Sequence, residues 1–200
     1  MEGHSRPYRM KRRAEALEST RNQIVWATMQ LHAEKGAAAT SQADIAARAG
    51  VSPATVYRHF PTLGSLVRAC GGQIWTAVSP PRPEDAGRLF EGLGTTHERL
   101  EKFVEEVSAF YARAWLPLQN ARQDRSRVPE LDEEMRWIEA GLEALAREAL
   151  RLEEAGEPRV QVLLALTDFG VWESLRDHGI TADAAPKMLL DLVRCALTGW

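Results

Sequence analysis

Four hydrogen-bonding side chains stand close together between Thr55 and His59. The stretch TVYRH supplies a hydroxyl, a phenol, a guanidinium and an imidazole. Groups of these kinds contact the phosphate oxygens and base edges of nucleic acids, and the arginine fork matches the O6 and N7 atoms of guanine. The stretch is therefore suited to contact a duplex, provided that a rigid element presents these side chains on one face.

The residues around TVYRH predict two short helices joined by a tight bend. Ser41 and Asp44 have the spacing of a capping box at the start of the first helix. Gly50 permits a positive φ at the bend. Ser52 is a favourable N-cap for the second helix, and Pro53 then stands at its first position, where a missing N–H costs nothing.

A helix as short as the second one needs tertiary contacts to be stable. We expect Val56 and Phe60, one turn apart, to dock it on the preceding helices. Its other face is then free, which is the geometry of a helix-turn-helix whose second helix reads DNA. The alternative is a solvated turn in an ordinary helical bundle. The face expected to be free consists of Pro53, Ala54, Thr55, Tyr57, Arg58 and His59.

The charge of the chain is divided unevenly. The net charge of the 200 residues is -3, and 44% of them are apolar, which is enough to form a core. Residues 1–70 hold ten Lys or Arg and five Asp or Glu, a balance of +5, so residues 71–200 hold the other fifteen and twenty-three, a balance of -8. A basic front half suits contact with a polyanion.

Other features of the sequence indicate a cytoplasmic protein. The two cysteines, Cys70 and Cys195, are too few and too far apart for a disulfide framework or a metal cluster. The charged N-terminus is not followed by the apolar segment of a signal peptide. No apolar run approaches the ~20 residues that span a bilayer. We therefore expect no cofactor, no metal and no membrane contact.

Composition and periodicity predict an all-α chain. Ala, Leu, Glu and Arg are abundant, and β-branched residues do not gather into alternating runs. We expect helices over about 14–35, ended by Gly36, and over about 63–78, then a Pro- and Gly-rich connection over 80–96. Beyond it we expect a long helix from 97, a shorter helix and loop over 116–129, a long helix from 131, one helix ended by Gly179 over 158–178, and a last helix.

The run TSQADIAARAGVSPATVYRHFPTLGSL resembles the DNA-binding signature of TetR-type transcriptional regulators, and the likeness covers about residues 24–66. The resemblance implies a homodimeric repressor that binds a palindromic operator. On this basis residues 1–19 are a basic arm and the start of helix one, residues 20–66 are a three-helix DNA-binding domain, and residues 67–200 are a helical domain that binds a small effector and dimerises.

The resemblance also implies roles for single residues. It places Ser41 at a phosphate and Arg58 at a base, with Arg58 the best candidate for a guanine contact. The sequence departs from the family pattern at Leu63, where many members have a lysine that grips phosphate, and at His32, where an aromatic core residue is common. The full predicted DNA-binding set is Ser41, Gln42, Ser52, Pro53, Ala54, Thr55, Tyr57, Arg58 and His59.

The segment before the first predicted helix is rich in cations. These side chains can lie along phosphates or enter the minor groove. A disordered, solubilising tail is the alternative, and the sequence favours neither. The cations are Arg6, Arg9, Lys11, Arg12 and Arg13.

The last two predicted helices carry more apolar surface than one layer of a bundle needs. The resemblance implies that they form the dimer interface, as a four-helix bundle with two helices from each chain. A palindromic operator needs two readers about one turn of duplex apart, ~34–36 Å, and one chain supplies one. The alternative is that both helices belong to the core of one chain.

An aromatic-rich set spread over three predicted helices is the candidate effector site, because small-molecule pockets are mainly apolar with a few polar groups. Asp168, on an apolar helix, indicates a buried carboxylate that needs a partner. The set favours a flat or hydrophobic effector, although aromatic side chains at helical spacing are also common in a plain core. It consists of Phe110, Tyr111, Trp115, Gln119, Arg122, Trp137, Asp168, Phe169 and Trp172.

We expect the effector to shift the helix over 63–78 and so to release DNA. The alternative is a ligand that strengthens DNA binding and acts as a co-repressor. An enzyme is not indicated, because the histidines are scattered and CGG at residues 70–72 lacks the Lys and Ser or Thr of a phosphate loop. A helical protein-interaction module would leave the basic segment and the Tyr57–His59 face without a role.

Overall fold

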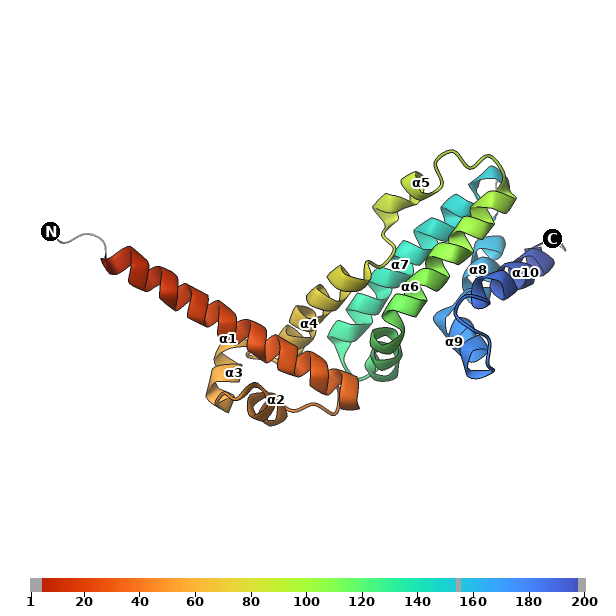
Figure 1. Cartoon of the computed structure of the whole chain (residues 1–200). Helices are drawn as coiled ribbons and strands as arrows, with labels where there is room; N and C mark the ends of the chain where they lie inside the picture. Colours follow the sequence, from red (N-terminus) through yellow and green to blue (C-terminus); the bar gives the residue numbers. More distant parts are fainter. Residues whose placement is uncertain (1–4, 154–155, 198–200) are drawn as a thin grey trace. The chain divides into compact units, whose positions relative to one another are not determined.

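The computed structural model describes residues 5–153 and 156–197. Throughout these ranges the regular structure is helical and contains no strand (Figure 1), so the predicted all-α class is confirmed. No helix in these ranges is both long and apolar enough to cross a bilayer. The helices are α1 (Ser5–Lys35), α2 (Gln42–Ala49), α3 (Pro53–His59), α4 (Leu63–Val78), α5 (Ala86–Leu89), α6 (Thr96–Asp124), α7 (Pro129–Ala149), α8 (Glu157–Leu166), α9 (Phe169–Asp177) and α10 (Ala185–Leu197), with short 3-10 helices at Pro83–Asp85 and Arg151–Glu153.

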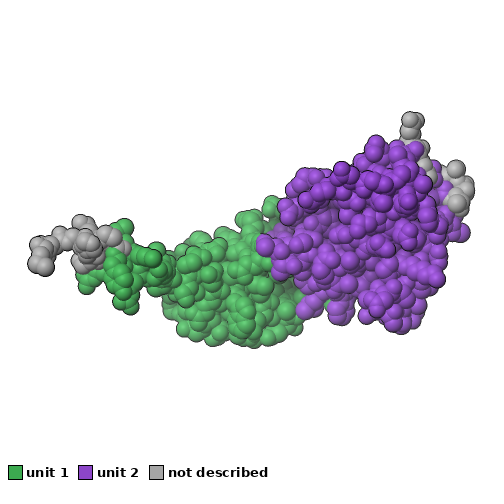
Figure 2. Space-filling view, turned by 45° about the horizontal axis from the view of Figure 1, so that its top comes forward, with its two compact units in different colours: residues 1–74, 119–133 green, residues 75–118, 134–200 purple. Residues whose placement is uncertain are grey.

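The chain divides into two compact units (Figure 2). Unit 1 consists of residues 1–74 and 119–133, and unit 2 consists of residues 75–118 and 134–200. Helices α4, α6 and α7 each contribute residues to both units. Unit 1 therefore contains more than the segment over 20–66 that the sequence singles out, because the end of α6 and the start of α7 belong to it.

Unit 1 has one apolar core, to which α1, α2, α3 and α4 all contribute. Val56 and Phe60 of the short helix are 0% and 3% exposed and belong to this core. The prediction that these two side chains dock α3 is therefore confirmed. The core consists of Ile24, Val25, Ala27, Leu31, Ile45, Ala46, Ala49, Val56, Phe60, Leu66 and Cys70.

The basic segment before residue 14 is part of α1, which begins at Ser5. The helix start expected near residue 14 is therefore wrong. Residues 8–19 contain no Gly or Pro, and strong helix formers such as Arg, Met, Ala, Glu and Leu predominate, so nothing ends the helix there. Every side chain from Tyr8 to Ser19 is exposed. The Arg6 side chain lies outside the described residues.

Two hydrogen bonds within unit 1 join the end of α1 to the end of α6. Asn120 Nδ2 donates to the His32 carbonyl at 3.2 Å, and the Ala38 N–H donates to Asp124 Oδ2 at 2.9 Å. Gly36 lies at this junction with a φ of 83°, and a Cβ there would stand 2.7 Å from Asp124 Oδ2. Glycine is required here both for its left-handed backbone and for the close approach of the carboxylate.

The His32 imidazole lies at the same junction and is mostly buried. Burial lowers the pKa of His32 from 6.5 to about 4, and the Asp124 carboxylate opposes this shift only in part. Within the described residues, His32 Nε2 is buried without a hydrogen-bond partner. The imidazole is therefore neutral in the folded protein at pH 7, because its charged form would lose hydration on burial.

In the second half of the chain, the shorter helix expected over 116–129 does not exist as a separate element. Helix α6 runs without interruption from Thr96 to Asp124, with Pro117 inside it. An internal proline removes one backbone hydrogen bond of the helix. Ala114 and Leu118, on either side of Pro117, are both buried, and the packing of these turns holds the helix together.

The single helix expected over 158–178 is also wrong. Helix α8 ends at Leu166, and α9 begins at Phe169. The carboxylate of Asp168 is the N-cap of α9 and accepts a hydrogen bond from the Gly170 N–H at 2.7 Å. Asp168 is exposed, so the expectation of a buried carboxylate is wrong too. The capping carboxylate satisfies an N–H group at the start of α9, and this allows a new helix to begin there.

Within unit 2, Arg99 at the start of α6 ties the loop after α5 to the end of α7. Its buried guanidinium donates to the carbonyls of Phe90 at 3.2 Å and Leu93 at 3.3 Å. It also donates to the carbonyl of Glu148 at 2.9 Å and to Glu148 Oε1 at 2.6 Å. The buried charge is thus paired and hydrogen-bonded, which is the condition for tolerating it.

Replacement of His32 tests the junction of α1 and α6. Between pH 7.5 and pH 5 the unfolded chain takes up a proton at His32, whereas the folded protein with its lowered pKa does not. The free energy of unfolding should therefore fall by about 1–2 kcal/mol over this range because of His32. His32→Phe should remove this part of the pH dependence in urea unfolding. His97→Gln, on the exposed surface of α6, is the control, and a His32→Phe protein with the wild-type pH dependence would contradict the assignment.

Two substitutions, one in α3 and one at the residue that caps its C-terminal end, separate the buried face of this segment from its exposed face. Phe60→Ala removes a buried aromatic side chain and should lower the free energy of unfolding by about 3–5 kcal/mol. Tyr57 is 61% exposed, so Tyr57→Ala should change it by less than about 0.5 kcal/mol. Thermal and urea unfolding of both variants measure this contrast. Equal destabilisation would mean that α3 is rotated about its axis.

Candidate nucleic-acid interface

The first helix of the bend, α2, begins with the expected capping box. The Asp44 N–H donates to Ser41 Oγ at 3.1 Å, and the Ser41 N–H donates to Asp44 Oδ2 at 3.0 Å. Lys35 Nζ lies 2.8 Å from the same carboxylate. Hydrogen bonds from Lys35 and then from Ser41 hold the pKa of Asp44 well below its usual range. The start of α2 is therefore fixed by an ionised cap at neutral pH.

The bend and the start of α3 also have the expected form. Gly50 has a φ of 64°, and its N–H and that of Val51 close the end of α2. Ser52 Oγ accepts a hydrogen bond from the Thr55 N–H at 3.2 Å, with Pro53 in the first turn. The local sequence thus sets both the angle of the bend and the first turn of α3.

The free face of α3 is narrower than expected. Tyr57 and Arg58 are exposed, as are Pro53 and Ala54. His59 is half-buried, and within the described residues its Nε2 is shielded without a hydrogen-bond partner. The phenol and the guanidinium are therefore the two large polar groups on α3 that can reach the edge of a base.

Three other members of the predicted set stabilise the fold around α3. Gln42 Nε2 donates to the Phe60 carbonyl at 3.3 Å and so joins α2 to the end of α3. The hydroxyls of Ser52 and Thr55 lie 2.9 Å apart. These side chains position the helix, and their hydrogen bonds leave them less available for DNA than Tyr57 or Arg58.

A groove within unit 1 lies between α1 and α3. It has a volume of about 670 Å³ and is lined by Arg58 and His59 of α3 and by Arg13, Leu17 and Arg21 of α1, among others. Arg13, Leu17 and Arg21 recur at every fourth residue. They continue the face of α1 that is buried further along, at Ile24 and Leu31.

Arginines lie at both walls of the groove, and Glu18 of α1 also lines it. The Arg21 guanidinium lies over the Phe60 ring, 5.2 Å from its centroid, and this contact holds it beside α3. The sequence lists the cations of the N-terminal segment but does not reveal this groove, because it forms only when α3 docks against α1.

The predicted effector residues do not come together at one site. Phe110, Tyr111, Phe169 and Trp172 are buried, and their rings pack on one another with centroids 5.4 to 6.1 Å apart. This is an aromatic core of unit 2. The other members of the set are exposed, namely Trp115, Gln119, Arg122, Trp137 and Asp168.

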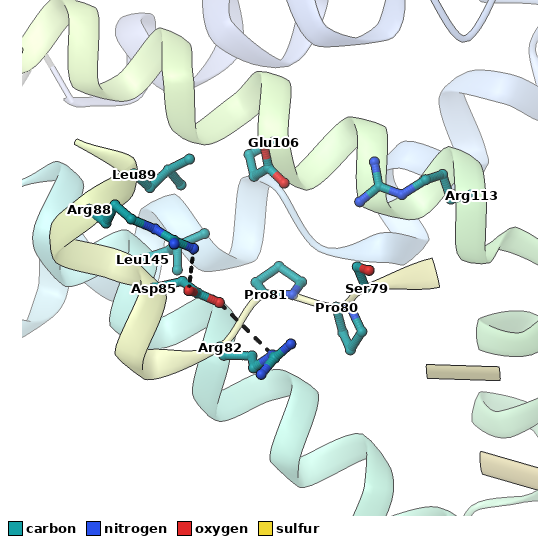
Figure 3. Close-up of a pocket in the computed structure, with 10 residues that line it drawn as sticks. All are labelled: Ser79, Pro80, Pro81, Arg82, Asp85, Arg88, Leu89, Glu106, Arg113 and Leu145. Atoms are coloured by element: carbon teal, nitrogen blue, oxygen red, sulfur yellow. Dashed lines mark hydrogen bonds and ion pairs between the residues drawn. The ribbon is translucent and has the colours of Figure 1, made fainter. Parts of the chain in front are cut away.

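Unit 2 contains a cleft of about 400 Å³ that none of the predicted effector residues lines (Figure 3). Its walls come from the connection between α4 and α5, from α6 and from α7. Sequence reasoning missed it because the residues that line it lie far apart along the chain. The one available signal is the segment SPPRPED, which holds three prolines and Arg82.

The described residues contain no group of His, Cys, Asp or Glu side chains that could hold a metal ion. Cys70 is buried, and its Sγ lies 3.7 Å from the Val25 carbonyl. Cys195 lies on the exposed surface of α10. In the described part of the chain both cysteines are thiols, not parts of a disulfide.

Solved structures similar to this chain share its fold. NalD of Pseudomonas aeruginosa, described as the secondary repressor of the MexAB-OprM multidrug efflux pump, is 22% identical over 88% of this chain and 96% of its own, with a TM-score of 0.64. A TetR-like transcriptional regulator from Rhodococcus sp. RHA1 is 18% identical over 90% and 97%, with a TM-score of 0.60. Salmonella enterica GusR is 26% identical over 88% and 96%, with a TM-score of 0.50.

A likeness to a known family covers the segment that forms the bend and its supporting helices. Residues 24–70 match the model of the bacterial regulatory proteins of the tetR family, and no curated protein matches the chain. The matched segment contains the capped helix α2, the Gly50 bend and the reading helix α3. The match over these residues and the shared fold support a transcriptional regulator of the TetR family.

Proposed function

We propose that this regulator binds a palindromic operator as a homodimer, represses transcription there, and is released by a small molecule. The observation that carries the proposal is the exposed Tyr57–Arg58 face of α3, which rests on the buried Val56 and Phe60. A rigid, capped helix with a free phenol and a free guanidinium suits base recognition in the major groove. The repressor role is further supported by the likeness to NalD.

Phosphate contacts position the reading helix in this proposal. The basic groove between α1 and α3 lies beside Arg58, and its arginines suit the DNA backbone that borders the major groove. Arg9, Lys11 and Arg12 extend the positive charge along the exposed part of α1. We therefore assign the groove arginines to backbone contacts and Arg58 with Tyr57 to base contacts.

Dimerisation through α8 and α10 is supported by the apolar surface of α10. Its side chains at Leu189 and Val193 are buried, whereas Met188 and Leu192 are 41% and 45% exposed. Helix α10 packs against α8 within unit 2, and Ala165 of α8 is exposed as well. These side chains give the pair an apolar outer face that a second copy would cover.

Effector control acts through α4 in this proposal. Three residues separate the end of α3 from the start of α4, which extends to Val78, next to the Ser79 that lines the cleft in unit 2. An effector that prefers the arrangement of α4 unable to bind DNA lowers operator affinity by a coupling of about 1–3 kcal/mol. A ligand with the opposite preference would be a co-repressor, and titration of operator-bound protein gives the sign.

Tyr57→Ala tests the proposal as a whole. In a gel shift with genomic fragments, the wild-type protein should retard a small set of fragments, with two chains bound per site. Tyr57→Ala should lose this selective retardation while it keeps its fold, because the phenol faces solvent. A protein that retards no fragment at low salt, or all fragments equally, would contradict the proposal.

Arg58→Ala tests base recognition. Loss of the guanidinium should relax the base preference at one position of each half-site and weaken binding of the preferred base by about 1–3 kcal/mol. Arg48→Ala is the matched control, since the Arg48 fork is already paired with Glu34 at 2.9 and 2.7 Å. Anisotropy titrations over single-base variants of the bound site measure both. An unchanged base preference in Arg58→Ala would mean that another residue makes the base contact.

Arg13→Gln tests the groove. One lost phosphate contact should reduce the slope of log K against log salt by about one unit, with little change in base preference. Arg12→Gln is the control, because Arg12 lies one residue away and does not line the groove. If both variants reduce the slope equally, the charge of α1 acts as a whole and the groove has no special role.

A further inference from the structure

The cleft in unit 2 has an apolar wall and charged side chains on more than one side (Figure 3). Glu106 and Arg113 of α6 line it on one side, and Pro80 and Pro81 of the connection after α4 line it on another, with Leu145 of α7. A volume of about 400 Å³ is within the range of small-molecule sites. The argument that follows rests on the proposed effector control.

The connection that forms the apolar wall is held tightly in place. Gly141 of α7 lies so close to the Pro81 carbonyl that a Cβ would stand 2.1 Å from it. Ser79 has a φ of 48°, a conformation that non-glycine residues adopt only where surrounding contacts enforce it. Arg113 Nε donates to the Val78 carbonyl at 3.2 Å. The wall is therefore preformed, which lowers the entropy lost on binding a ligand.

Most charges at the mouth of the cleft are already paired. Arg88 lies 2.8 Å from Asp85, and Arg82 lies 3.9 Å from Asp85 and 3.8 Å from Glu84. These exposed pairs neutralise one another and contribute little specificity for a ligand.

Glu106 and Arg113 differ from these pairs. Within the described residues, the half-buried Glu106 carboxylate has no hydrogen bond or ion pair, and Arg113 uses its Nε alone, at Val78. The terminal nitrogens of Arg113 thus have donors to offer a ligand, and Glu106 has acceptors. Seven residues separate the two on one face of α6, which places their Cα atoms roughly 10 Å apart along the helix.

We propose that this cleft is the effector site, and that the effector carries a carboxylate for Arg113, a hydroxyl or amino donor for Glu106, and a short apolar body for Pro80, Pro81 and Leu145. The effector class is thus a small dipolar acid, in place of the flat hydrophobic molecule that the aromatic set favours. Arg–carboxylate pairs are strong and directional, and the buried prolines and Leu145 accept the apolar part.

The position of Arg113 also connects the cleft to α4. Val78, whose carbonyl accepts from Arg113, is the last residue of α4. A ligand carboxylate that binds the terminal nitrogens of Arg113 would draw the guanidinium toward itself and so shift the Nε contact with this carbonyl. Binding therefore changes the contact that holds the C-terminal end of α4. The N-terminal end of α4 follows the reading helix α3 in the chain.

Matched small molecules test the ligand class without DNA. The probes are 4-hydroxybenzoate and 4-(aminomethyl)benzoate, which carry an acid at one end and a donor at the other. The uncharged 4-hydroxybenzamide and the donor-free benzoate are the controls. Isothermal calorimetry gives the affinities, and the arginine Nε–Hε signals in NMR spectra report on Arg113. Both probes should bind and shift the Arg113 signal, and each control should bind about tenfold more weakly.

Substitutions test the location. Arg113→Gln should weaken both probes at least about tenfold, and Glu106→Gln should weaken 4-(aminomethyl)benzoate by a similar factor. Glu105→Gln is the control, because Glu105 is exposed on α6 and does not line the cleft. Circular dichroism checks that each variant is folded. Arg122→Gln should bind both probes like the wild type.

The outcomes separate this inference from the proposed function. Failure of both acids to bind, equal affinity for 4-hydroxybenzamide, or loss of binding in Arg122→Gln but not in Arg113→Gln would each overturn the assignment of the cleft. None of these results concerns the affinity for operator DNA, which is measured without a ligand. Conversely, a protein that binds the acids but no DNA would support the assignment of the cleft and would contradict the proposed operator binding.

Discussion

The burial of Val56 and Phe60 is the contact on which the DNA-binding surface depends. A helix of seven residues has no stability of its own in water. Its inner side chains pack into the core formed by α1, α2 and α4, and its ends are closed by Ser52 and by the Gln42 hydrogen bond to Phe60. Because this packing fixes the rotation of α3 about its axis, Tyr57 and Arg58 are held outward on a defined face, ready to meet a duplex.

Helix α4 is the element that links the proposed operator binding to the proposed effector control. Helix α4 starts just after the reading helix and ends at the carbonyl that Arg113 holds, so one continuous element extends from the DNA-binding surface to the cleft. Cations gather on α1, and Arg58 adds one on α3, while residues 71–200 are acidic overall. In the proposed control, a small acid bound in the cleft alters the end of α4 at Val78, and the first residue of α4, Leu63, follows α3 closely in the chain.

The parts of the fold that depend on neighbouring residues could be predicted from the sequence, and the parts that depend on distant ones could not. Caps and bends depend on four or five neighbouring positions, so the roles of Ser41, Gly50 and Ser52 can be predicted from the local sequence. The sequence alone does not give the role of Asp168, because a carboxylate in an apolar stretch is compatible with a buried charge and with an N-cap. The backbone break between α8 and α9 shows that it is an N-cap. The predicted effector set divides into packed rings and exposed residues, because helical spacing does not distinguish rings that line a cavity from rings that fill a core. The sequence does not reveal the cleft, because α6 and α7 bring Arg113 and Leu145 to a segment some thirty to sixty residues earlier.

The selection of bound duplexes from a fully random library, at low salt and without ligand, tests the central claim most directly. If α3 is the reader and two copies act together, the enriched sequences should form a palindrome whose half-sites are centred about one helical turn apart, ~34–36 Å or a small multiple of it. Enrichment of no sequence, or of a single asymmetric element occupied by one chain, would contradict the account.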